Sequence, residues 1–178
     1  MSSGEGGSGR RRALLWVFGV PVGLLLVGLI VGMLLPVEHQ AGVQATLPAP
    51  AEAVWQRIRD IPASADWRPN VERFETLEDR DGRPAFTEHG DWGPMSFVID
   101  EDVPNERLVT RIIDEPSFGG TWTFELEPVS EGSCRITITE DGTISNPFFR
   151  VLSRFVFGYS GNLEKYLAAL EAAVGPGE

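Results

Sequence analysis

The fold is decided by the last apolar segment of the chain, residues 146–174, which reads NPFFRVLSRFVFGYSGNLEKYLAALEAAV. Asn146 can accept a hydrogen bond from an unpaired N–H of a first helical turn, and Pro147 suits the first helical position. Apolar residues then recur at spacings of three and four, which predicts one helix with a single apolar stripe that must be buried. Gly175 and Pro176 end the pattern. The stripe consists of Phe148, Leu152, Phe155, Tyr159, Leu163, Tyr166 and Leu170.

The residues before this helix predict short β-strands joined by tight turns. Trp122, Phe124 and Leu126 alternate with polar residues, a period typical of a strand with one dry face. Because the connecting segments are short, neighbouring strands should be antiparallel. We therefore expect an α+β fold in which a curved antiparallel sheet wraps around the last helix, with room for a pocket between them. The expected strands are 43–47, 71–77, 84–88, 95–100, 107–113, 121–126 and 134–139.

The charge of the chain is unevenly distributed. The formal net charge is -11, yet Arg10, Arg11 and Arg12 against Glu5 give residues 1–36 a net charge of +2, which leaves -13 for the remainder. Phosphate contacts need clustered Lys and Arg, so this acidic remainder argues against nucleic-acid binding.

The single cysteine and two histidines limit other kinds of chemistry. Cys134 cannot form an intrachain disulfide, and we expect it to be a small core residue on a strand. His39 and His89 with one cysteine make a transition-metal site unexpected. We predict no metal and no cofactor, and we expect His39 to be solvated.

Residues 13–35 predict a transmembrane helix. The segment has no charged side chain, and at about 1.5 Å per residue it extends about 35 Å, enough for a hydrocarbon core of about 30 Å. A cleaved signal peptide is the alternative, but it would have a shorter apolar run and a small-residue cleavage site. The preceding arginines predict a cytoplasmic N-terminus and an extracytoplasmic C-terminal domain in the cell membrane. The spacing of Gly28 and Gly32 also matches a pattern seen in helix dimers.

These observations divide the chain into segments. We expect a disordered basic N-terminus at 1–12, the transmembrane helix at 13–35 and a linker at 36–42. One globular domain should follow at 43–174, with a tail at 175–178.

Two stretches resemble the START/Bet v 1-like superfamily, also called SRPBCC or polyketide cyclase/dehydrase-like. They are 47–55, LPAPAEAVW, followed by Asp60, Trp67 and Pro69, and 120–128, GTWTFELEP. The resemblance covers most of the expected domain and implies a helix-grip fold around a hydrophobic cavity. It implies no catalytic residue, because the superfamily includes lipid carriers, hormone receptors and aromatase/cyclases.

Aromatic side chains are predicted to line the cavity, although an ordinary packed core is the alternative for each of them. Glu88 and Glu140 are the catalytic candidates, because each continues the inward parity of its strand. An inward carboxyl group would have a raised pKa, whereas a strand that ends early would leave it in solvent. The cavity set is Trp67, Phe74, Phe86, Phe97, Trp122, Phe124, Phe155 and Tyr159.

Three functions are compatible with this pattern. The first is a membrane-anchored domain that binds a hydrophobic small molecule or lipid without catalysis, which needs only a cavity and a few polar contacts. The second is a protein-interaction domain that uses the apolar surface around residues 149–157. The third is a cyclase or dehydratase that uses Glu88 or Glu140 for acid/base chemistry. The residue pattern fixes neither the ligand nor the oligomeric state.

Overall fold

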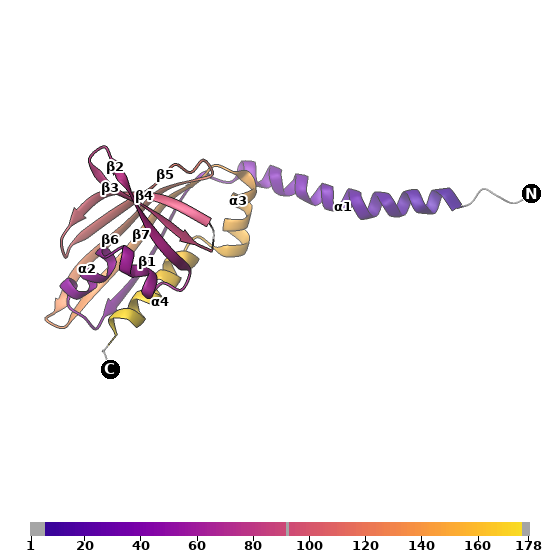
Figure 1. Cartoon of the computed structure of the whole chain (residues 1–178). Coiled ribbons are helices and arrows are strands. Elements are labelled where there is room, and N and C mark those ends of the chain that lie inside the picture. Colours follow the sequence, from indigo (N-terminus) through magenta and orange to yellow (C-terminus); the bar gives the residue numbers. More distant parts are fainter. Residues whose placement is uncertain (1–5, 92, 176–178) are drawn as a thin grey trace, which may run out of the picture.

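The computed structural model describes residues 6–91 and 93–175, with side chains from Gly19 onward. Seven antiparallel strands form one curved sheet in the order β1-β7-β6-β5-β4-β3-β2, and helices lie against its concave face (Figure 1). This arrangement confirms the predicted α+β helix-grip architecture. The strands are β1 (Glu38–Leu47), β2 (Val71–Arg80), β3 (Arg83–Gly90), β4 (Gly93–Val103), β5 (Arg107–Ile113), β6 (Phe118–Ser130) and β7 (Ser133–Ile144).

The first strand begins earlier than its sequence suggests. β1 starts at Glu38, within the segment expected as the linker 36–42, and pairs with β7 along its whole length from Glu38–Thr143 to Leu47–Cys134. The local pattern of β1 is weak, and pairing with a long neighbour decides its extent. Between β1 and β2 lie the helix α2 (Ala51–Arg59) and the short helical turn η1 (Pro62–Asp66).

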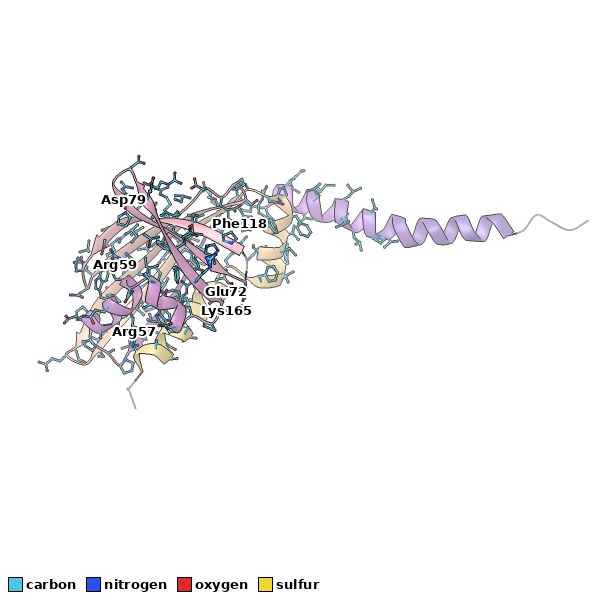
Figure 2. All side chains as sticks on the ribbon, in the orientation of Figure 1. Arg57, Arg59, Glu72, Asp79, Phe118 and Lys165 are labelled. Atoms are coloured by element: carbon cyan, nitrogen blue, oxygen red, sulfur yellow. The ribbon has the colours of Figure 1, made fainter. Side chains whose placement is uncertain are left out.

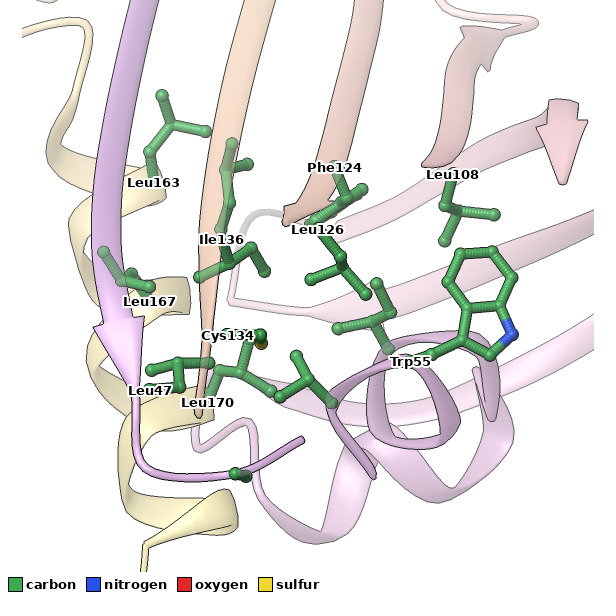
Figure 3. Packing of buried hydrophobic residues seen from close by; sticks show 14 of the residues in the cluster. Leu47, Trp55, Leu108, Phe124, Leu126, Cys134, Ile136, Leu163, Leu167 and Leu170 are labelled. Atoms are coloured by element: carbon green, nitrogen blue, oxygen red, sulfur yellow. The ribbon is translucent and has the colours of Figure 1, made fainter. Parts of the chain in front are cut away.

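The core lies between the concave face and the C-terminal helix α4 (Gly161–Val174). Leu163 and Leu170 of α4 are fully buried, and Leu167 is nearly so. They pack with Ile136 of β7 and with other residues of the sheet and α2 (Figure 3). Burying each leucine contributes about 1.5–3 kcal/mol, so this packing fixes α4 on the sheet. Cys134 is fully buried here, as predicted.

The predicted single helix 146–174 is wrong in one respect. The segment forms α3 (Pro147–Leu152), a π-helical turn η2 (Ser153–Phe157) and α4, with a break at Gly158. Gly158 has φ 74° and ψ 164°, a conformation that residues with a Cβ rarely adopt. The predicted start of the helix is confirmed, because the Asn146 side chain accepts a hydrogen bond from the Phe148 N–H at 2.9 Å.

The break explains why the apolar stripe is not buried along its full length. Its residues from Leu163 onward face the sheet, whereas Phe148 is 50% exposed and Phe155 is 64% exposed. α3 lies at the edge of the domain, beside Phe118 at the start of β6 (Figure 2). Phe149 contacts Phe118, with ring centroids 5.2 Å apart. The N-terminal part of the segment therefore forms a separate structural unit.

The helix α1 (Gly6–Leu34) projects from this edge of the domain (Figure 1). It begins before the predicted span 13–35 and includes part of the predicted disordered segment 1–12, of which residues 1–5 lie outside the described residues. In the part of the chain with described side chains, which omits residues 13–18 of the predicted span, no helix is both long enough and apolar enough to cross a membrane.

Candidate ligand site on the concave face

Aromatic side chains cover the concave face on both halves of the sheet. On β2, β3 and β4, Phe86 lies between Phe74 and Phe97, with ring centroids 5.9 Å and 5.3 Å away. On β6, Trp122 and Phe124 lie with their centroids 6.2 Å apart. The strand register produces this clustering, because Phe86 is directly opposite Phe97. Of these five rings only Phe124 is fully buried; the others are half-buried.

Tyr166 of α4 joins these aromatic residues at the centre. Its ring centroid lies 5.3 Å from Trp67, 6.0 Å from Trp122 and 5.3 Å from Phe124. Burial raises the pKa of the Tyr166 hydroxyl group well above its usual range. The hydroxyl group is therefore neutral at physiological pH and can both donate and accept hydrogen bonds.

An ion pair lies beside Tyr166 on the β2–β3 side. Arg68 Nη1 is 2.7 Å from Glu88 Oε2, and the two side chains are only 13% and 19% exposed. The Arg68 guanidinium group also lies over the Tyr166 ring at 5.0 Å and over Phe74 at 5.8 Å. β3 continues to Gly90, so Glu88 keeps the inward parity of Phe86 and is not left in solvent.

Two buried N–H groups next to this pair have no hydrogen-bond partner among the described residues. They are Trp67 Nε1 and Arg68 Nε. Buried donors are normally satisfied, so unpaired donors on the concave face indicate a place for an acceptor atom from a ligand or water.

A second polar cluster lies at the other end of the concave face. His39 Nε2 of β1 is 3.5 Å from Glu140 Oε1 of β7, and the Trp122 indole N–H donates to the Glu140 carboxyl group. Tyr159 stacks on the His39 ring with centroids 4.3 Å apart. The position of His39 corrects the expectation that it is solvated. Its imidazole occupies the space above Gly142, where a Cβ would overlap it.

Burial shifts the pKa values of both titratable groups in this cluster toward their neutral forms. It raises the pKa of Glu140 to about 7, although the hydrogen bond from Trp122 acts in the opposite direction. Burial lowers the pKa of His39 below its usual 6.5. Burial therefore favours a protonated carboxyl group on Glu140 and a neutral imidazole on His39.

The two clusters form one continuous line across the concave face. Tyr166 contacts Arg68 on one side and Trp122 on the other, and Trp122 leads to Glu140. Both predicted carboxylates therefore lie on the same surface, each at one end of an aromatic floor. In order, the line is Glu88, Arg68, Tyr166, Trp122, Glu140, His39 and Tyr159.

Some of the described residues lie outside this line. Phe155, predicted for the cavity, is 64% exposed and does not belong to the packed aromatic residues. Arg111 pairs with Asp100 at 2.6 Å, and Asp100 also pairs with Arg83. Two surface hollows of about 450 Å³ and 310 Å³, beside Trp55 and Gln40, are not lined by the concave-face aromatic residues. Within the described residues, no three His, Cys, Asp or Glu side chains group as metal ligands would.

Sequence patterns identify only part of this site. Parity placed Glu88 and Glu140 on the inner face, but Arg68 lies in an irregular segment with no period to read. His39 lay in an expected linker, so its inward position depended on a strand that was not predicted. Tyr166 belonged to the helical stripe, which gave no sign of its central place.

Comparisons with known proteins agree with this architecture. A family model described as polyketide cyclase / dehydrase and lipid transport matches residues 38–175. A START superfamily protein from Mycobacterium smegmatis shares 20% identity with a TM-score of 0.63, covering 76% of this chain and 97% of that chain. The Zhui aromatase/cyclase from a Streptomyces species shares 19% identity with a TM-score of 0.66, covering 77% of this chain and 93% of that chain.

A third solved structure has the same fold. Truncated norcoclaurine synthase from Thalictrum flavum shares 14% identity with a TM-score of 0.63, covering 80% of this chain and 96% of that chain. At such identities the structural likeness establishes the fold alone. A search of curated proteins finds no match.

The family match covers most of the chain and coincides with the domain that carries the concave face. The fold defines a helix-grip domain of the START-like class. The chain belongs to the polyketide cyclase / dehydrase and lipid transport family.

Proposed function

We propose that this chain is a membrane-anchored SRPBCC-type domain that binds a hydrophobic small molecule or lipid on its concave face, without catalysing a reaction. The ligand has an apolar body and at least one hydrogen-bond acceptor. The body lies on the floor formed by Phe86, Phe97 and Trp122, and the acceptor reaches the Trp67 N–H. Mostly apolar walls with a few polar groups are typical of small-molecule sites.

One observation carries this proposal. The inward-facing rings of Phe74, Phe86, Phe97 and Trp122 remain half-buried, although they share the inner face of the sheet with the fully buried Ile136 and Ile138. A filled core would bury both sets alike. Removing the exposed area of these rings from water would contribute about 25 cal/mol per Å² to ligand binding.

The membrane anchor is the second part of the proposal. Residues 13–35 carry no charged side chain, and the described part of α1 exposes large apolar residues, among them Leu24, Leu25 and Ile30. The preceding arginines support a cytoplasmic N-terminus and an extracytoplasmic domain. A phosphatase fused after Glu178, active only outside the cytoplasm, should be active. Activity only from a fusion partner that works in the cytoplasm would contradict this orientation.

Native mass spectrometry tests the ligand proposal. The full chain, extracted in a mild detergent, should carry an apolar adduct that organic extraction removes. Trp67→Phe keeps an aromatic ring but removes the unpaired N–H, so it should reduce adduct occupancy several-fold. The matched control is Trp55→Phe on α2, which should retain the adduct. Equal occupancy in the two variants, or no adduct in any preparation, would contradict the proposal.

Acid/base catalysis is a second candidate function, favoured by the Glu140–His39 pair. A carboxyl group with a pKa of about 7 can donate a proton at neutral pH, and a neutral imidazole beside it can accept one. Such a pair suits a cyclisation or dehydration of a polyketide-like substrate. Glu140→Gln would then abolish turnover of a poly-β-keto thioester and leave its binding mostly intact. Recovery of this bound substrate unchanged from the unsubstituted chain would exclude this candidate for that class.

A further inference from the structure

A group of large apolar side chains is exposed where α1 meets the domain. Phe148 of α3 is 50% exposed, and Phe155 and Val156 of η2 are 64% and 65% exposed. Single exposed apolar residues are common on protein surfaces, but a contiguous group usually marks an interaction site. These three side chains define the α3–η2 patch.

The patch is held at a fixed position relative to α1. A Cβ on Gly32 would overlap the carbonyl oxygen of Pro147, so α1 and α3 are in close backbone contact. The buried Arg150 donates from Nη1 to the Leu35 carbonyl oxygen at 2.9 Å and from Nη2 to the Ser145 carbonyl oxygen at 3.3 Å. Arg150 thereby satisfies an unpaired carbonyl group just beyond the end of α1, where a cation is also electrostatically favourable.

The charge around the patch differs from that of the rest of the domain. Residues 37–178 have a net charge of -13, but residues 142–163 contain no Asp or Glu. They contain Arg150, which is buried, and Arg154, which is exposed within η2. An exposed arginine among apolar side chains suits the headgroup region of a lipid surface, where the guanidinium group can meet lipid phosphates while the apolar side chains insert.

The backbone of η2 produces the exposure. The π-helical turn Ser153–Phe157 ends at Gly158, and this turn interrupts the phase that would direct Phe155 toward the sheet. Tyr159 follows immediately and returns to the interior, where it stacks on His39. The same short segment therefore presents Phe155 outward and, four residues later, directs Tyr159 toward His39.

We propose that Phe148, Phe155 and Val156 insert into the interfacial region of the bilayer that holds α1. This inference rests on the proposed membrane anchor. The apolar surface of α1 continues directly into the patch, so the bilayer is the partner that can cover both surfaces at once. Docking in this way places the His39–Glu140 end of the concave face next to the lipid.

Fluorescence from single labels on the full chain tests the inference. The environment-sensitive dye NBD is attached to Val156→Cys, to Val129→Cys and to Leu26→Cys in separate samples. Val129 is 51% exposed on β6, near the end of the strand far from Phe118, and serves as the matched control. Cys134 is fully buried and stays in place, with the unsubstituted chain correcting for any background labelling. The samples are reconstituted in phosphatidylcholine–phosphatidylglycerol vesicles, with or without lipids that carry a doxyl quencher.

The expected result is a blue-shifted emission and a several-fold quenching by doxyl lipid at positions 156 and 26, with neither at 129. Quenching at 26 without quenching at 156 would overturn the docking inference and leave the anchor intact. No quenching at 26 would overturn the anchor, and the docking inference with it. A blue shift at 156 without doxyl quenching would show that protein, such as a second copy of the chain, covers the patch, and would also overturn the inference.

Discussion

Glu140 is a carboxyl group kept in a place that favours its neutral form. Burial raises its pKa to about 7, and its closest cationic candidate, His39, has a pKa lowered by burial as well. Holding an acid in such surroundings destabilises the folded protein once the acid ionises. A buried side chain whose ionisation near neutral pH lowers the stability of the folded protein is typical of functional sites rather than of positions that only stabilise the fold.

Glu140→Gln should make the protein more stable at neutral and higher pH. The unfolded chain loses the Glu140 proton near pH 4.5 and the folded chain near pH 7, so ionisation lowers the free energy of unfolding between these values. The shift corresponds to at most about 3 kcal/mol. The advantage of the variant, measured by urea titration, should grow as the pH rises across this range and stay level above it.

His39 contributes to stability with the opposite sign. Its pKa is lower in the folded protein, so as the pH falls the unfolded chain binds a proton at a higher pH than the folded protein does. The free energy of unfolding therefore rises with pH up to about 6.5. The difference in unfolding free energy between the Glu140→Gln variant and the unsubstituted protein therefore isolates the contribution of Glu140 better than the pH dependence of the unsubstituted protein alone. Glu131→Gln, in the exposed β6–β7 turn, should show no such growing difference. A constant difference for Glu140→Gln across the range would contradict the burial of its carboxyl group.

Arg68 and Glu88 should show strong energetic coupling. Arg68→Met leaves a mostly buried carboxylate without its cation, which should cost about 3 kcal/mol of unfolding free energy, the lower end for a buried pair because the two side chains keep some exposure. Adding Glu88→Gln should restore much of this loss. A double-mutant cycle measures the coupling, with the more exposed pair Arg107–Glu125 as a control expected below about 1 kcal/mol. Equal coupling energies in the two pairs would contradict the burial of the Arg68 and Glu88 side chains.

At the scale of elements, the junction between α1 and α3 determines how the helix is attached. Gly28 and Gly32 match a spacing seen in helix dimers, yet Gly32 packs against Pro147 of its own chain. Nothing described lies within 4 Å of a Cβ placed on Gly28. One of the two glycines is therefore used for contact within the chain.

Gly32→Leu should separate α1 from α3, whereas Gly28→Leu should not. The added side chain would overlap backbone atoms of Pro147, and overpacking of this kind costs typically about 1–3 kcal/mol. Hydrogen exchange of the α3 amides is the measurement, and exchange should be faster in the Gly32 variant only. Identical exchange in both variants would show that α1 does not pack on α3.

The elements also show what sequence patterns can predict. Turn signals delimit the six strands from β2 to β7, clear periods mark β6, β7 and the part of the last helix that forms α4, and all of them were predicted. β1 was predicted too short, because its first residues are held by pairing with β7. The continuous helix 146–174 was predicted from spacing alone, which does not register the backbone conformation of Gly158. Parity likewise placed the two carboxylates but not Arg68, which comes from an irregular segment.

At the scale of the whole molecule, the apolar surface forms one path from α1 to the concave face. The exposed residues of α1 lead to the α3–η2 patch, and the patch leads through Tyr159 to the concave face. The ion pairs of Arg83 and Arg111 with Asp100 lie outside this path. This separation of apolar from charged surface is what the proposed function requires, because a domain that exchanges an apolar ligand with a bilayer needs an apolar path between the two.

The indole N–H signals of the full chain test the concave-face site most directly. ¹⁵N-labelled protein purified in mild detergent is compared with the same protein after its apolar adduct has been extracted. The signals of Trp67 and Trp122 should shift on extraction, since both rings belong to the concave face, while that of Trp55 on α2 should stay in place. Unchanged Trp67 and Trp122 signals, with adduct present before and absent after, would contradict a ligand on the concave face.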